Sequence, residues 1–215
     1  MSIIRVALCS AFLAGLGCGV AHATVDFNNL GNDSGNIYGV TTVVNGGAGP
    51  IAQSFTSSGT YLTDLTLELG GGAADGGSFV ITLHSNSGGA PGAIVGSALA
   101  TVSDSVISST PGAYTLNFIN AAISSGTTYW IELADANPTG ANTTGVTWTV
   151  AQDANGTGTA GQLLYETGAT NSPPFVMEVT TANTPEVPEP ATLALMGVGL
   201  AGLGWVRSRR TARKG

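Results

Sequence analysis

Apolar and polar side chains alternate with a period of two along most of the chain. Within 61–69, for example, leucines stand at every second position from Leu65 onward, and the residues between them are polar. Successive side chains of a β-strand point to opposite faces, so this pattern predicts strands with one apolar face. The residues expected on the apolar faces are Leu65, Leu67, Leu69, Phe79, Ile81, Leu83, Tyr114, Leu116, Phe118, Val146, Trp148, Val150, Phe175, Met177 and Val179.

Turn-forming residues separate these runs every eight to twelve positions, as in an all-β domain. We expect about ten strands and an antiparallel β-sandwich of jelly-roll type over residues 24–180. The glycine-rich segment 70–77 is predicted to be a long hairpin loop, and 181–187 a short linker. The 215 residues suffice for one domain with a hydrophobic core.

The charges are distributed unevenly. Residues 24–206 contain no Lys or Arg, where average usage would supply on the order of twenty. All 13 acidic residues lie in that stretch. Such a surface repels nucleic acid and excludes DNA and RNA as partners. The acidity fits either the solubility of an exported protein or the bridging of divalent cations.

Residues 1–23 have the anatomy of a secretory signal peptide. Arg5 precedes an apolar stretch at 6–20, and the small-x-small sequence at 21–23 predicts cleavage by signal peptidase before Thr24. The alternative is a lipoprotein acylated at Cys18, but Gly15 stands where a lipobox prefers leucine. Both cysteines fall within this segment, so the mature body is expected to have no thiol.

The chain from 188 to 215 combines a proline-rich motif, an apolar stretch and a basic cluster. Pro188-Glu189-Pro190 precedes the apolar residues 191–206, which would rise about 24 Å as a helix, against about 30 Å of bilayer hydrocarbon. A short transmembrane helix is therefore predicted, with the body outside, because basic clusters stay cytoplasmic. A plain membrane anchor is the alternative. The basic cluster consists of Arg207, Arg209 and Arg210.

These three features, in this order, resemble the PEP-CTERM sorting domain of Gram-negative bacteria. The resemblance implies that an exosortase, a protease embedded in the inner membrane, recognises Pro188-Glu189-Pro190, cuts nearby, and releases or transfers the body. Such systems accompany exopolysaccharide production. The protein is thus expected at the inner membrane as a precursor, and afterwards at the outer surface or in the extracellular matrix.

Three short segments of the body are similar to "choice-of-anchor" β-sandwich domains, which precede alternative surface-anchoring tails. They are 52–56, which we expect to precede a strand, 83–92 and 126–133. The resemblance implies an architecture and surface display, and it brings no catalytic or binding residues with it.

Groups for catalysis are scarce. His84 is the single histidine after residue 23, and we expect it to be exposed beside a turn. With no thiol, it cannot build a zinc site without carboxylates. Asp64 and Glu68 share a strand face but stand about 13 Å apart, too far for glycoside hydrolysis. We therefore expect no enzyme, and a glycan-active enzyme using another carboxylate pair remains the alternative.

Two candidate binding sites remain. Asp33, Asp153 and Asn155 offer oxygen ligands for Ca²⁺ in turns, although neither turn continues into an EF-hand loop. Alternation sends Trp130 outward beside Glu132, where the ring could stack on a sugar as in a carbohydrate-binding module or adhesin. Against this, the register could be shifted by one residue, or a loop could cover Trp130. No other cofactor is expected.

Overall fold

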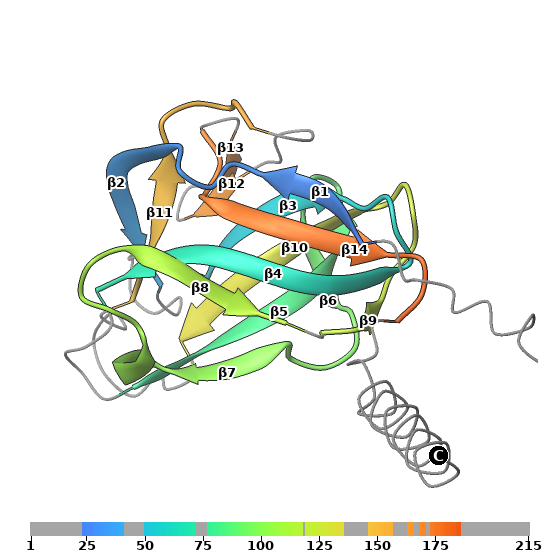
Figure 1. The fold of residues 1–215 in the computed structure, drawn as a ribbon, viewed down its shortest axis with the longest axis horizontal. Helices are drawn as coiled ribbons and strands as arrows, with labels where there is room; N and C mark the ends of the chain where they lie inside the picture. The colour runs from blue at the N-terminus through green and yellow to red at the C-terminus, as the bar shows by residue number, and fades with distance from the viewer. Residues whose placement is uncertain are drawn as a thin grey trace, which may run out of the picture.

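The computed structural model of the protein shows two antiparallel β-sheets packed face to face (Figure 1). It describes residues 23–40, 50–71, 77–117, 119–135, 146–156, 163–165, 168–170 and 173–185. The predicted all-β sandwich is thereby confirmed, and its jelly-roll type stays a prediction. The signal peptide, apart from Ala23, lies outside the described residues, as does all of 188–215. Within the described part, no helix is long and apolar enough to cross a bilayer.

The first sheet is built around a long central strand. Its strand order is β1 (Thr24–Asn28), β14 (Met177–Ala182), β4 (Tyr61–Gly70), β11 (Thr147–Ala151) and β2 (Asp33–Gly39). Two further strands also pair with β4, namely β8 (Gly112–Leu116) and β9 (Ala121–Ala122). The first and last strands of the domain are therefore neighbours.

The second sheet has β10 and β5 at its centre. Its strand order is β13 (Gly168–Thr170), β12 (Leu163–Tyr165), β3 (Ile51–Thr56), β10 (Thr128–Asp135), β5 (Ser78–Ser87) and β6 (Ala90–Ile94). A short strand, β7 (Ala100–Ser103), also pairs with β5 and leads into the 3₁₀ turn η1 (Asp104–Val106).

The predicted apolar faces meet between the two sheets. The leucines of β4, the alternating residues of β5 and the apolar positions of β11 and β14 are all buried there, while Tyr114 and Leu116 are partly buried. Trp148 is fully buried, as expected. Its ring stacks on Phe175 with centroids 4.5 Å apart, and its Nε1 donates a hydrogen bond to the Val176 carbonyl at 2.9 Å. Phe118 lies outside the described residues.

One of the predicted connections is wrong. The segment 70–77 does not join a hairpin, because β4, which ends at Gly70, belongs to the first sheet and β5, which begins at Ser78, belongs to the second. The segment 52–56 precedes β4, as expected, and itself lies in β3. In addition, β14 runs to Ala182, so the start of the expected linker belongs to the sheet.

A buried glutamine joins the two sheets through the core. Gln53 in β3 is fully buried, and its pairing opposite Ile131 places its side chain on the inner face. Its Oε1 accepts a hydrogen bond from the Phe175 backbone N–H at 2.9 Å, and its Nε2 donates to the Ser54 carbonyl at 3.0 Å. The amide thus gives the buried Phe175 N–H an acceptor in the core.

Replacing Gln53 with leucine is expected to lower the free energy of unfolding by about 1–3 kcal/mol, because the Phe175 N–H would be left buried without an acceptor. Urea unfolding followed by tryptophan fluorescence measures this loss. Thr56→Ala, at the exposed end of the same strand, is the matched control and should change stability by less than about 0.5 kcal/mol. Equal losses in the two variants would contradict the role assigned to Gln53.

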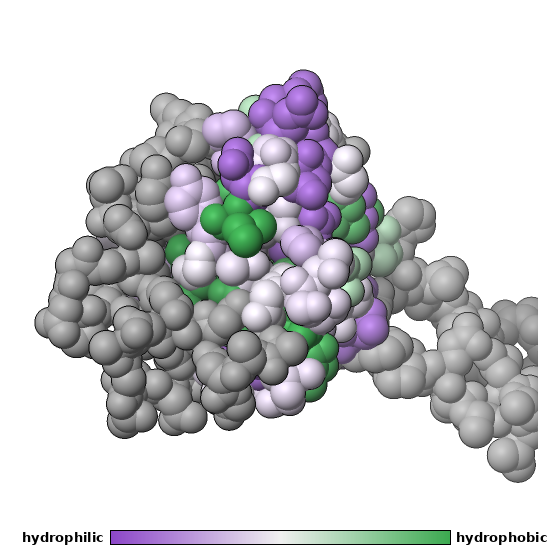
Figure 2. Space-filling model, turned by 90° about the vertical axis from the view of Figure 1, so that its left-hand side faces the viewer, coloured by the Kyte–Doolittle hydropathy of each residue, from purple (hydrophilic) through white to green (hydrophobic). Residues whose placement is uncertain are grey.

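Large exposed apolar side chains are scattered over the described surface. They are Val25, Ile37, Ile94 and Val106. Figure 2 views the end of the molecule at the left of Figure 1, where most described residues are pale or purple and green is confined to small separate patches. Single exposed apolar residues of this kind are normal on folded proteins and mark no interface by themselves.

Candidate functional site

The outer face of the second sheet gathers one aromatic and several polar side chains. Alternation along β10 puts Tyr129, Ile131 and Leu133 in the core and sends the residues between them to the opposite face. The pairing of β10 with β5 then sets Trp130 opposite His84 and Glu132 opposite Thr82. We call this group the Trp130 cluster; its members are Thr82, His84, Asn86, Trp130 and Glu132.

Trp130 faces away from the core, yet it is fully buried. The ring therefore has no exposed face on which a sugar could stack, and its Nε1 donates to Asn86 Oδ1 at 3.0 Å. The strand register agrees with the expected alternation, so a register shifted by one residue is excluded. Trp130 is instead buried because other parts of the chain cover it.

Part of the cover comes from β6. This strand is two places from β10 in the sheet, a spacing of nearly 10 Å in a flat sheet, yet Cα atoms of the two strands approach within 8 Å. The His84 ring, which points to the outer face, contacts the Gly92 carbonyl of β6. The β5–β6 ribbon therefore curls over the face that holds Trp130.

His84 is buried, which corrects the expectation of an exposed histidine. Its Nδ1 lies 2.9 Å from the Gly92 carbonyl oxygen, which can only accept, so Nδ1 carries a proton. Its Nε2 lies 2.9 Å from Thr82 Oγ1 and 3.5 Å from Glu132 Oε1. In the neutral ring Nε2 accepts from the threonine hydroxyl, and in the protonated ring it faces a carboxylate.

Burial raises the pKa of Glu132 above its ordinary value of 4.5, and the neighbouring His84 opposes this by favouring the carboxylate. The folded protein therefore holds the Glu132 proton more tightly than the unfolded chain does. Its contribution to stability is largest at low pH and is lost as the pH rises from 4.5 through the raised pKa.

Glu132→Gln is expected to raise the free energy of unfolding at neutral pH, with the gain shrinking as the pH falls through the raised pKa toward 4.5. Glutamine has no proton to lose, so the penalty of burying a charge disappears. Urea unfolding between pH 4 and pH 7 checks this. Asp64→Asn removes one negative charge from the other sheet and controls for the overall acidity. Identical pH profiles for the two variants would show that the burial of Glu132 has no particular effect.

The first sheet carries carboxylates on its own outer face. Asp64 and Glu68 lie four residues apart on β4, and the register sets Glu178 of β14 opposite Thr66, between them. Glu178 is thus diagonal to both acidic residues, about 7–8 Å from each. Asn28 Nδ2 donates a hydrogen bond to Glu178. Sequence reasoning missed this grouping because Glu178 comes from the far end of the chain.

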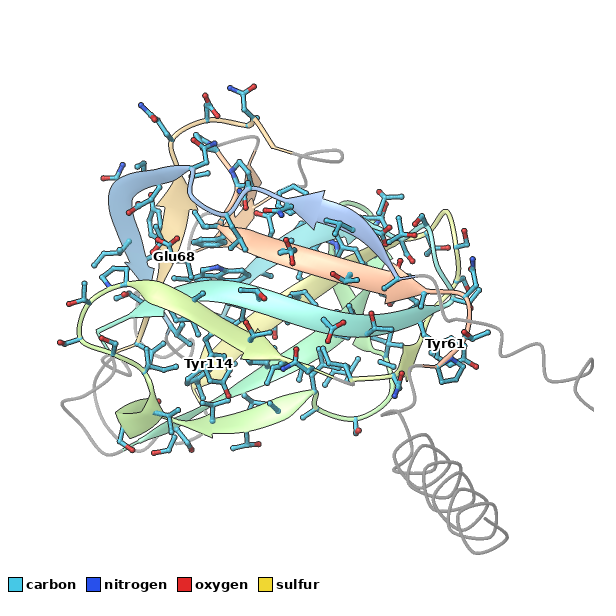
Figure 3. The ribbon with its side chains drawn as sticks, in the orientation of Figure 1. Tyr61, Glu68 and Tyr114 are labelled. Carbon is cyan, nitrogen blue, oxygen red and sulfur yellow. The ribbon has the colours of Figure 1, made fainter. Side chains whose placement is uncertain are left out.

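Glu68 lies toward the β2–β11 end of β4 (Figure 3). Burial, together with the negative charge of Asp33, raises its pKa above the ordinary value of 4.5. Burial raises the pKa of Glu68, and Glu178 lies diagonal to it across the sheet, so this pair of carboxylates is an arrangement that resembles a general acid and base.

The candidate calcium ligands serve their own turns instead of converging on one point. Asp153 Oδ1 accepts from Asn32 Nδ2 at 2.7 Å and from the Asn155 N–H at 2.9 Å, and these hydrogen bonds lower the pKa of Asp153. Asp33 Oδ1 accepts from the Gly35 N–H at 2.6 Å. Among the described residues, no group of three His, Cys, Asp or Glu side chains is placed to hold a metal ion.

Residues 186–210 match the family model of the PEP-CTERM protein-sorting motif. The match covers the tail and leaves the sandwich unassigned. Searches of curated proteins and of solved structures found no match to this chain. The motif implies an exported protein that an exosortase processes and that is sorted to the cell surface.

Proposed function

We propose, from the premise that the tail is a PEP-CTERM sorting motif, that this is a non-enzymatic protein of the cell surface or extracellular matrix. Signal peptidase would remove residues 1–23, and an exosortase-like membrane protease would then act at Pro188-Glu189-Pro190. The body would be delivered into an envelope rich in exopolysaccharide. The observation that carries this proposal is the match of residues 186–210 to the sorting motif.

The body then serves as a displayed scaffold, of the choice-of-anchor type. The arrangement of its polar groups supports a structural role. Trp130 Nε1 and His84 Nδ1 are hydrogen-bonded within the domain, and the Asp153 carboxylate accepts hydrogen bonds from Asn32 and from its own turn. Such groups hold the fold, and a ligand would have to displace existing hydrogen bonds to reach them.

The intact mass of the protein from its native host, recovered from both cells and medium, tests the proposal. The expected species begins at Thr24 and ends near Pro190, and any additional mass identifies an attached group. A strain lacking the exosortase should retain the tail. A wild-type species that still carries Arg207 to Gly215 would instead make the tail a plain membrane anchor.

The carboxylates of the first sheet provide a separate test of the enzyme alternative. Incubating the purified body with the polysaccharide of its host is expected to release no new reducing ends. The control is Glu68→Gln combined with Glu178→Gln, which should behave identically. Reducing ends that appear with the wild type and vanish in the double variant would identify a glycan-active enzyme.

A further inference from the structure

The two ends of the body leave the sandwich side by side. Strand β1 pairs antiparallel with β14, which brings Thr24 opposite Thr181. The start of β1 and the end of β14 accordingly lie together at the right of Figure 1. The predicted signal-peptide cleavage site and the beginning of the tail therefore share one end of the domain, which we call the exit end.

Hydrogen bonds fix the chain where it leaves β14. The Thr60 N–H donates to the Ala182 carbonyl at 2.9 Å, and Thr60 Oγ1 donates to the Asn183 carbonyl at 3.1 Å. Gly59 packs so closely here that an added Cβ would stand 2.8 Å from Ala182 backbone atoms. The path of the chain is thus held as far as Asn183.

The length of chain beyond this point limits how the body can stand on a membrane. Ala182 and Pro188 are six residues apart in the sequence and can be separated by at most about 20 Å. The ten residues of β4 put the opposite end of the sandwich about 30 Å away. While Pro188 is at the membrane surface, the sandwich therefore cannot stand inverted, with its opposite end against the membrane and the exit end about 30 Å above it.

The exit end is also chemically distinct. The turns 57–60 and 123–127 lie together here, because the Ser57 N–H donates a hydrogen bond to the Thr127 carbonyl at 3.0 Å. These two turns and the segment 183–185 contain no charged residue. Among the described residues, the carboxylate hydrogen-bonded to this end is that of Asp26, which accepts from the Ser58 N–H and the Thr181 hydroxyl. Anionic lipid headgroups repel carboxylates, so they disfavour the acidic outer face of the first sheet far more than this end.

A tyrosine completes the exit end. Tyr61 begins β4, is partly buried, and lies at the opposite end of that strand from Glu68 (Figure 3). Tyrosine suits the boundary between headgroups and water, since its ring is apolar and its hydroxyl is polar.

We infer that the exit end lies against an anionic lipid bilayer while the tail is being processed, so that the sandwich stands upright with its acidic outer faces away from the membrane. The inference rests on the proposed function, because it requires the tail to be in the membrane. Its consequence is that the protease meets the body in one orientation.

Single cysteines test this orientation, since residues 24–215 contain none. The chain Thr24–Gly215 with Ser124→Cys at the exit end, or with Ser109→Cys in the segment before β8, would carry a fluorophore. Both serines are exposed. The labelled proteins would be inserted into vesicles of phosphatidylethanolamine and phosphatidylglycerol that contain headgroup spin-labelled lipid. The label at residue 124 is expected to be quenched several-fold more strongly than the label at residue 109.

Flotation of the same samples distinguishes the two ways of failing. Protein that floats with the vesicles but shows equal quenching at both positions would overturn the orientation and leave the proposed function intact. Protein that does not float would show that the tail is not inserted in the membrane, and this would contradict both the proposed function and the inference. Unfolding in urea, measured for each labelled variant, verifies that the sandwich is folded.

Discussion

Replacing Pro188, Glu189 and Pro190 together with alanine is expected to abolish removal of the tail, so that the protein accumulates in the cell as the chain from Thr24 to Gly215. The three residues lie near the start of the segment 186–210 that matches the sorting motif, and we propose that they are the sequence that the exosortase recognises. Intact mass and membrane fractionation of the native host would measure the result.

Pro185→Ala is the matched control for this variant. It removes a proline from the same short linker but lies outside residues 186–210, so normal processing is expected. Normal processing of the triple variant as well would show that the protease does not read Pro188-Glu189-Pro190. Retention of the tail in both variants would instead point to the shape of the linker as the feature recognised.

Replacing Trp148 with alanine is expected to lower the free energy of unfolding by about 3–5 kcal/mol. The ring is fully buried and stacks on Phe175, which in turn meets Tyr38 edge-on with centroids 6.0 Å apart. The cavity would open where Phe175 and the Gln53 amide link the sheets. Domains are typically stable by only about 5–15 kcal/mol, so this loss would leave little margin. Urea unfolding followed by circular dichroism measures it.

Trp148→Phe separates packing from hydrogen bonding at the same position. Phenylalanine keeps an aromatic ring against Phe175 but cannot donate to the Val176 carbonyl, so a smaller loss than that of alanine is expected. A loss below about 1 kcal/mol for Trp148→Ala would mean that the surrounding side chains collapse into the space, contrary to a tightly packed core.

The strands that could be predicted from sequence are those with a strict alternation. In β4, β5, β11 and β14 nearly every second side chain is a large apolar residue, and these side chains are buried. The strands β12 and β13 have three residues each, which is too few to show an alternating pattern. The segment 70–77 was misjudged for a different reason, because glycine composition marks a turn but does not say which sheet the next strand joins.

The candidate sites could likewise be predicted only where a local alternation defines them. Trp130 and Glu132 share a strand, so alternation placed both on the outer face correctly. Their partners His84 and Asn86 come from β5, and only the pairing register brings them together. Whether an outward residue is covered depends on how β6 curls, and a local pattern does not encode this. Long-range pairing likewise brings Glu178 to Asp64 and Glu68.

The pairing of β1 with β14 makes completion of the fold wait for the last strand of the body. Asn29, directly after β1, donates to the Phe175 carbonyl and accepts from the Met177 N–H, across nearly the whole length of the domain. Contacts of such high sequence separation slow folding, because a long loop must close before they form. A chain that crosses the membrane starting from its N-terminus would thus be unable to complete this sheet until β14 has emerged, so the full fold forms only after the body has been exported.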